Sequence, residues 1–344
     1  MVPRLVAYIS AARRPVVVVL DNVELISSPE CTTSIAEFAL RVPEWWRLAL
    51  ASSDALPIPM SRLRLAHEIV EIGMDHLAMS TDEATALRRG AGVTVSLAEA
   101  KELVKRTEGW PAGLYLAALA IKYGKPATGF RFTGDDRLVN DYFRSELLAR
   151  LSPSQTRFLV RTAILDRMSG PLCDAVVGST RSARMLEELE RHNLLVVPLD
   201  RQDEWYRYHH LLREFLRAEL RRDDPQMVNQ LHSRAATWYE QNGTAESAVE
   251  HASAALDTDR VARLVYELMQ PVWASGQIDT VRRWMEWLDK RPRVPRYAAI
   301  AAHGALIFAL LGHAQEAERW VGVAESFPAS GSLPDGNTVA GTLA

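Results

Sequence analysis

An apolar run at residues 16–20 ends in an acid and an amide, Asp21 and Asn22. A β-branched run of this kind is typical of a fully buried strand in a parallel sheet, and an aspartate at its carboxyl end can organise Mg²⁺ beside nucleotide phosphates. The pair therefore resembles a Walker B element in its chemistry. Asp21 is our candidate Mg²⁺ ligand, provided that a nucleotide binds, and no further catalytic residue is indicated beside Asp21 and Asn22.

The phosphate-binding loop that should accompany such a strand, G-x-x-x-x-G-K-[ST], is expected upstream of it. Only about fifteen residues precede the strand, too few for a preceding strand and loop. The one Gly-Lys pair, Gly124-Lys125, has Leu119 in place of the first glycine and Pro126 in place of the hydroxyl residue. The sequence therefore predicts that the phosphate loop is missing and that the chain alone is not an enzyme.

The composition predicts two or three globular domains, because the chain has 344 residues of which 48% are hydrophobic. A net charge of −3 excludes an overall basic field, so DNA binding would need a local patch. Two cysteines, Cys31 and Cys173, predict buried reduced thiols rather than a disulfide. Neither a signal peptide nor an apolar run of about 18 residues is present, which predicts a soluble cytoplasmic protein without membrane contact.

The elements that would position Asp21 form an α/β region that ends near residue 75. Apolar runs at 16–20, 48–51 and 69–72 predict three strands of a parallel sheet flanked by helices. The remaining chain is helical in pattern. Ser80, Ser96 and Ser152 each precede an acid or amide by three residues, which predicts three capped helix starts, and Pro111 opens another helix over 112–121.

Residues 150–220 predict three helices followed by a hairpin with strands at 194–199 and 205–208, the arrangement of a winged helix. Its third helix, at 184–192, would be the DNA-reading one. Arginines and glutamates balance on this helix and just before it: Arg181, Arg184 and Arg191 against Glu187, Glu188 and Glu190. A neutral helix lacks the phosphate neutralisation that dominates DNA affinity, so we do not expect it to bind DNA.

Beyond residue 225 the glycines Gly243, Gly276 and Gly312 recur at intervals close to the ~34-residue tetratricopeptide period, each after an aromatic or aliphatic run. The pattern predicts tetratricopeptide-like helical repeats, with an ordinary helical bundle as the alternative. The segment from residue 327 is rich in turn-forming residues and predicts a flexible tail.

Six short motifs occur in one order along the chain. They are Leu20–Val23, Pro57–Arg64, Thr107–Leu114, Gly134–Arg137, Ile164–Arg167 and Trp205–Leu212. Their combination closely resembles the MalT-like, large ATP-dependent LuxR-type transcriptional regulators, which are STAND-type signal-transduction NTPases. The resemblance extends from residue 1 to about 325.

The resemblance implies a mainly α fold with an incomplete N-terminal α/β part. It divides the chain into a partial P-loop NTPase sheet (1–75), a helical lid (76–132), a winged helix (133–224), tetratricopeptide-like repeats (225–326) and a tail (327–344). It also implies a switch in which ADP favours a closed monomer, while ATP and an inducer open it for oligomerisation. A LuxR helix-turn-helix, expected to be absent here along with the P-loop, would contact DNA.

The resemblance also implies roles for single residues. Gly109 and Pro111 match the lid motif that contacts the adenine, and His209, or alternatively His210, matches the histidine that reaches the β-phosphate. Asn22 takes the place of an acid that orients water, and Ser53 takes the place of a sensor arginine. An amide cannot accept the proton of the water, so hydrolysis should be slow or absent.

Three functions remain open at this point. The first is a regulatory fragment of such a switch, with ATP or ADP and Mg²⁺ as doubtful cofactors for this chain alone. Its expected partners are a missing N-terminal segment or another chain at residues 1–75, and an inducer or protein on the repeats. The second is an unconventional ATPase, and the third is a helical-repeat scaffold for a peptide or small ligand.

Overall fold

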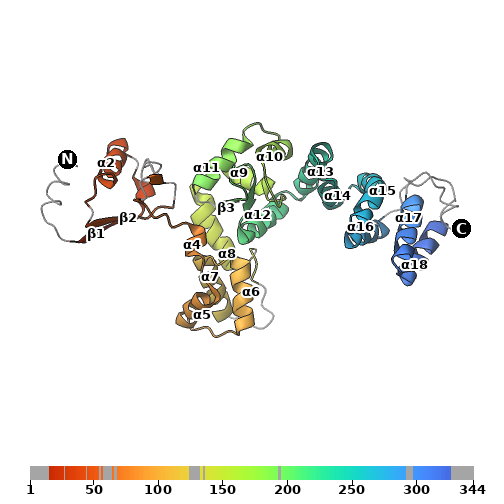
Figure 1. Ribbon diagram of the computed structural model, residues 1–344, viewed down its shortest axis with the longest axis horizontal. Helices are drawn as coiled ribbons and strands as arrows, with labels where there is room; N and C mark the ends of the chain where they lie inside the picture. Colours follow the sequence, from red (N-terminus) through yellow and green to blue (C-terminus); the bar gives the residue numbers. More distant parts are fainter. Residues whose placement is uncertain are drawn as a thin grey trace. The chain divides into compact units, whose positions relative to one another are not determined.

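The computed structural model describes residues 15–123, 132–192, 195–291 and 297–326, except for 27, 44, 54–55, 57–63, 66–67 and 135. The chain is mainly helical, with a small parallel sheet near its N-terminus (Figure 1). It divides into two compact units. The first contains Met1–Leu159, Leu165–Gly170 and Arg181–Ala218, and the second contains Val160–Ile164, Pro171–Thr180 and Glu219–Ala344. The Gly124-Lys125-Pro126 stretch, most of the Pro57–Arg64 motif and the predicted tail lie outside the described residues.

The N-terminal sheet pairs β1 (Val16–Leu20) with β2 (Trp46–Leu50) in parallel. Between them the chain forms a 3-10 turn, η1 (Val23–Leu25), and α2 (Pro29–Ala39). Two of the three predicted strands are thus confirmed. The prediction that β1 is fully buried is wrong, because Val17 and Val19 are 65% and 64% exposed. A parallel strand is buried on both faces only where helices cover both faces of its sheet.

The third predicted strand, at residues 69–72, does not form. This segment has no regular secondary structure, and in the described part of the chain the first sheet contains β1 and β2 alone. Val70 is 86% exposed. A short apolar run becomes a strand only when a neighbouring strand accepts its backbone hydrogen bonds, so the sequence pattern alone was insufficient here.

The two cysteines differ in environment. Cys173 is fully buried, as predicted. Cys31 is exposed, so the prediction of a second buried thiol is wrong. It lies in the first turn of α2, a helix without any buried residue among those described.

Next in the chain come α4 (Met74–Leu77) and a three-helix bundle of α5 (Thr81–Gly90), α6 (Leu97–Thr107) and α7 (Pro111–Lys122). The predicted starts are confirmed. The Ser80 hydroxyl accepts the Glu83 N–H while the Glu83 carboxylate accepts the Ser80 N–H, and Ser96 repeats this arrangement. Small residues of α7, which include Ala117 and Ala118, are fully buried and allow the helices to lie close together.

After α8 (Arg137–Tyr142) a π-helical turn (Phe143–Leu147) and a 3-10 turn (Leu148–Arg150) continue the helical path. The following elements are α9 (Pro153–Thr162), α10 (Gly170–Val177), α11 (Ser182–Arg191), β3 (Val196–Pro198), β4 (Tyr206–Tyr208) and α12 (His210–Asp223). This order confirms three helices, a hairpin and a further helix. The hairpin is antiparallel, with Val196 opposite Tyr208, and a bridge from Met168 to Tyr206 extends it.

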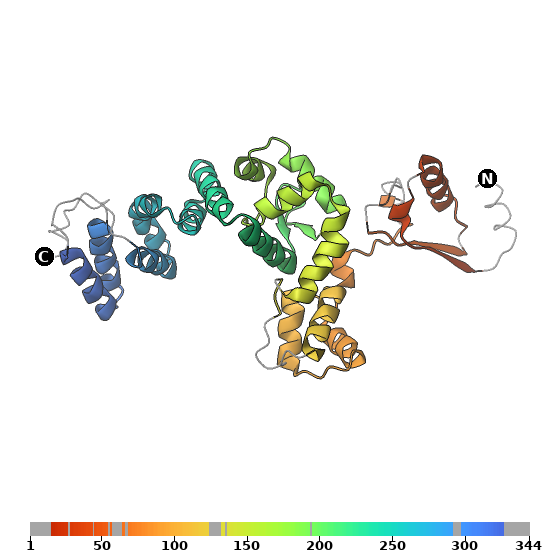
Figure 2. The same ribbon diagram turned by 180° about the vertical axis from the view of Figure 1, so that it is seen from behind.

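Six helices form the rest of the described chain. They are α13 (Pro225–Asn242), α14 (Ala245–Ala254), α15 (Thr258–Ala274), α16 (Ile278–Asp289), α17 (Tyr297–Leu310) and α18 (Ala314–Glu325), and they follow one another in pairs (Figure 2). Gly243, Gly276 and Gly312 have positive φ and end α13, α15 and α17, the positions at which left-handed backbone favours glycine. Among the described helices, none combines the length and the apolar composition that crossing a bilayer requires.

Candidate functional site

The Walker B-like pair lies at the carboxyl end of β1. Asn22 has a left-handed backbone, and its N–H donates to the Asp21 carboxylate at 2.9 Å. The sheet continues past these residues through the Val23 N–H, which donates to the Ala51 carbonyl at 3.1 Å. Asp21 and Asn22 are both exposed. The carboxylate could take up one position around Mg²⁺, but the described residues include no cluster of three or more His, Cys, Asp or Glu that could hold a metal.

A second carboxylate at this sheet edge was not predicted. The Ser53 N–H, at the end of β2, donates to Glu24 Oε2 at 3.3 Å. A hydrogen bond from its own backbone N–H, together with those from Ser53 and Ser52, lowers the pKa of Glu24. The resemblance implies a sensor arginine at position 53. In this chain the position holds a serine, whose N–H donates to the negatively charged Glu24. Glu24 follows Asp21 by three residues, which is the one sequence signal that could have identified it.

The Gly109-Trp110-Pro111 motif forms a tight connection between α6 and α7. Glu108 and Gly109 both have left-handed backbones, with φ of 50° and 73°. The Gly109 carbonyl accepts the Met79 N–H at 2.8 Å, and a Cβ on Gly109 would lie 2.9 Å from both the Met79 N and O atoms. Glycine is therefore required here by backbone conformation and by close approach. Pro111 occupies the first turn of α7, where its missing N–H costs nothing.

Trp110 is the centre of an aromatic cluster. Its ring stacks on Phe143 at 5.7 Å between centroids and meets Tyr142 and His209 edge to face at 5.3 and 5.8 Å. Gly113 permits this position, since a Cβ there would lie 2.7 Å from the Trp110 ring. The cluster shows that the tryptophan acts as a half-buried packing residue.

His209 precedes α12 and is 2% exposed. Its Nδ1 accepts the Leu211 N–H at 3.3 Å, so Nε2 must carry the proton that the Thr107 carbonyl accepts at 2.9 Å. Burial lowers the pKa of His209, an effect that the Glu108 carboxylate opposes. The ring is thus neutral with both nitrogens occupied. His210 is only partly buried, and its Nε2 lies 3.3 Å from Glu214 Oε1.

An ion pair beside His209 was also missed. Arg207 donates from Nη1 and Nη2 to the two carboxylate oxygens of Glu108 at 2.9 and 2.7 Å, and the His210 N–H donates to the same carboxylate at 3.1 Å. Burial is the largest single influence and raises the pKa of Glu108, but the Arg207 and His210 hydrogen bonds and the neighbouring positive charge together outweigh it, so the pKa lies below its usual value. The partners are 99 residues apart, so no local spacing could have paired them.

The structure therefore joins two of the three predicted parts of the site. The turn at Gly109 and Pro111 meets His209 through Thr107, Glu108 and Trp110. No hydrogen bond or ion pair between described residues links Asp21 to them. The assignment of Asp21, Gly109, Pro111 and His209 to nucleotide stays a prediction.

The three helices α9–α11, the β3–β4 hairpin and the following helix define the class of winged-helix proteins. Residues 144–228 match the family model described as the MalT winged helix domain. The chain is 31% identical over 253 residues to the serine/threonine-protein kinase PknK of Mycobacterium tuberculosis, which covers 73% of this chain and 23% of the kinase. It is 28% identical over 280 residues to the HTH-type transcriptional regulator MalT of Vibrio campbellii, with 79% of this chain and 31% of that protein covered.

These findings identify a MalT-like region that contains a MalT winged helix domain. A second regulator, MalT of Vibrio parahaemolyticus, is 27% identical over 279 residues. The chain spans between about a quarter and a third of the length of these curated relatives.

Proposed function

We propose that this chain is the regulatory region of a MalT-like transcriptional regulator, a switch gated by nucleotide and inducer that has little or no ATPase activity by itself. The observation that carries the proposal is the winged helix match at residues 144–228. The relatives include a protein kinase and transcriptional regulators, and their matches overlap over at least half of this chain. A region shared by such different effectors is better suited to control than to phosphorylation or DNA contact.

The residues at the β1 edge support weak or absent hydrolysis. Asn22 cannot act as a base towards water, and Ser53 supplies no cation to transferring phosphate. Glu24 adds negative charge to this edge of the sheet. Asp21 remains able to hold Mg²⁺ with ATP or ADP, so binding without turnover is the activity that these residues favour.

The partners that we propose are those that would cover the exposed surfaces of the N-terminal sheet and of the C-terminal helices. The two-stranded β1–β2 sheet has an exposed apolar face and, among the described residues, unpaired edges, so it calls for covering elements and a further strand, contributed by an N-terminal segment or by another chain. Helices α13–α18 would accept an inducer or a protein as tetratricopeptide-like repeats. DNA would be contacted by a LuxR-type domain, and the protein would act in the cytoplasm.

Calorimetric titration of the chain with Mg-ADP and Mg-ATP, together with a phosphate-release assay, tests the proposal. We expect no hydrolysis above background, and any binding should weaken when Asp21 is replaced by asparagine. Micromolar binding accompanied by turnover would instead establish the unconventional ATPase. Limited proteolysis tests whether residues 1–75 need a partner. In the isolated chain, a protease should cut these residues first. A resistant monomeric 1–75 region would contradict it.

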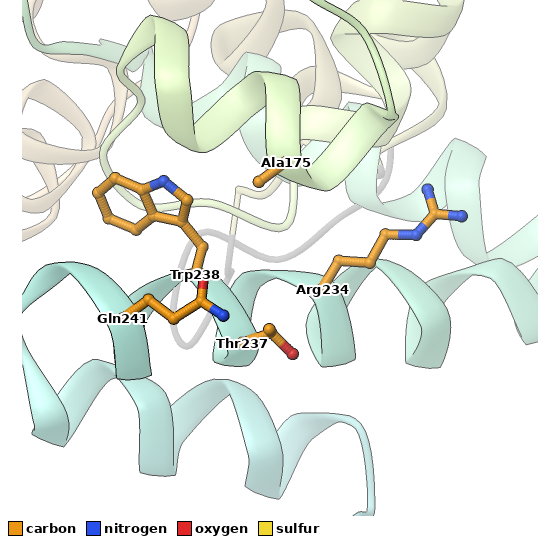
Figure 3. A pocket seen from close by; sticks show the side chains of 5 residues that line it. All are labelled: Ala175, Arg234, Thr237, Trp238 and Gln241. Atoms are coloured by element: carbon orange, nitrogen blue, oxygen red, sulfur yellow. The ribbon is translucent and has the colours of Figure 1, made fainter.

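A ligand-binding scaffold is a second candidate, favoured by a hollow of about 190 Å³ in the second unit. Ala175 of α10 and Arg234, Thr237, Trp238 and Gln241 of α13 line it. The Trp238 indole and the Arg234 guanidinium lie at opposite ends (Figure 3), which suits a planar ligand with an anionic end. Titration with benzoate should perturb Trp238 fluorescence in the wild type but not after Gln241→Trp, which fills the hollow. Absence of any perturbation would exclude this site.

A further inference from the structure

The region around His209 contains a connection that does not depend on a nucleotide. Four hydrogen bonds join residues 107–108 of the α5–α7 bundle to residues 207–210 of the winged helix. Three converge on the Glu108 carboxylate, two from Arg207 and one from the His210 backbone, and the fourth runs from His209 Nε2 to the Thr107 carbonyl. All of these residues belong to the first compact unit.

The ion pair is of the kind that contributes appreciably to stability. It is bidentate, and the Arg207 and Glu108 side chains are 34% and 29% exposed, so water screens them only in part. Charge-assisted bonds of this type are stronger than ordinary surface pairs, which often contribute almost nothing.

The backbone at Glu108 supports the same conclusion. A non-glycine residue with φ of 50° is held in an unfavourable conformation and persists where its surroundings determine it. Here that conformation turns the carboxylate towards Arg207 and the Thr107 carbonyl towards His209. The connection therefore lies in the left-handed turn between α6 and α7.

We propose that Glu108 and Arg207 form a nucleotide-independent latch, which keeps His209 bonded to Thr107 and thus unavailable to a phosphate group until the latch opens. The phosphate as the competing partner of His209 rests on the proposed function. The latch itself rests on the four bonds, because both ring nitrogens of His209 are already occupied in the latched state. Opening must break the Thr107 bond before His209 can donate elsewhere.

Hydrogen exchange of the full chain without nucleotide tests the latch. Glu108→Gln removes the charge and keeps the shape, and Arg207→Lys keeps the charge but loses the bidentate geometry. We expect each variant to raise exchange at residues 107–110 and 209–212 by about tenfold or more, as the loss of a charge-assisted bond implies. Exchange in α13 and α14 should change less than twofold.

Glu188→Gln is the matched control. Glu188 pairs with Arg184 at 3.0 Å within the single helix α11, and the Arg184 side chain is 82% exposed. This variant should leave exchange at both segments unchanged. Wild-type exchange in either Glu108→Gln or Arg207→Lys would overturn the latch, and so would an equal increase throughout the chain, including α13 and α14. Since the experiment contains no nucleotide, failed ATP or ADP binding would refute the proposed function without altering this result.

Discussion

Replacing Gly109 by alanine separates two costs that the structure places on one residue. Gly109 has φ of 73°, and a Cβ would lie 2.9 Å from backbone atoms of Met79. Gly92, at the end of α5 in the same bundle, has φ of 78° with nothing within 4 Å of its Cβ position. Gly92→Ala therefore measures the backbone cost alone, whereas Gly109→Ala adds the steric cost.

The expected magnitudes differ accordingly. A left-handed alanine costs about 1–2 kcal/mol, which is the whole effect at Gly92. At Gly109 the Met79 backbone must move, which adds about 1–3 kcal/mol for overpacking and about 1 kcal/mol for weakening the Met79 N–H bond to the Gly109 carbonyl. The reduction in unfolded-chain entropy is common to both variants and cancels in the comparison. The difference between them should be about 2–4 kcal/mol.

Hydrogen exchange in α5–α7 is the appropriate assay, because a chain with two compact units has no single free energy of unfolding. Since 1.4 kcal/mol corresponds to a factor of ten, exchange in Gly109→Ala should exceed that in Gly92→Ala by roughly 30-fold to 700-fold. Equal exchange in the two variants would refute the close approach to Met79 as the reason for this glycine.

Three further predictions follow from buried groups. The pKa of His209 is lowered in the folded state, so the unfolded chain binds more protons below about pH 6.5, and the stability of the first unit should fall as the pH decreases from there, by at most about 1.4 kcal/mol per pH unit. His209→Gln should flatten this pH dependence in hydrogen-exchange measurements between pH 7.5 and 5. An unchanged slope would contradict the assignment of the pH dependence to His209. Arg88 is fully buried and none of its guanidinium nitrogens has a hydrogen-bond partner, and burial lowers its pKa although the nearby Glu99 carboxylate raises it. Arg88→Met should therefore stabilise α5–α7 by about 1–3 kcal/mol in exchange measurements. A destabilised variant would show that the charge is needed. In a thiol titration, Cys31 should react in the folded chain and Cys173 only after unfolding, because Cys173 is buried and burial raises its pKa. Two rapidly reacting thiols in the folded chain would contradict the burial of Cys173.

The features that sequence predicted well are local ones. The Ser80, Ser96 and Ser152 caps need only four consecutive residues, and all three form as expected. The hairpin strands and the glycines that end α13, α15 and α17 likewise depend on short patterns. A strand at residues 69–72 failed because its existence depends on a neighbour that the run itself cannot specify.

The candidate site shows the same limit. Gly109 and Pro111 could be identified as a helix start, and His209 or His210 as the candidate histidine, but the sequence did not decide which of the two is buried. The link from Glu108 to Arg207 could not, since it joins residues 99 positions apart through a left-handed turn. Long-range pairing depends on tertiary contacts, and no periodicity within either segment encodes it.

Several arginines of the winged helix form ion pairs with glutamates of the same chain. Its α11 helix neutralises itself through pairs from Arg184 to Glu188 and from Arg191 to Glu187, which leaves little positive charge to release counterions from DNA. Its cationic Arg207 instead faces Glu108 in a partly buried pair. Because Arg207 pairs with the Glu108 carboxylate, this ion pair would have to break before Arg207 could bind a phosphate group. The Arg207–Glu108 ion pair therefore joins the winged helix to the α6–α7 turn, and both guanidinium nitrogens that point at Glu108 are occupied.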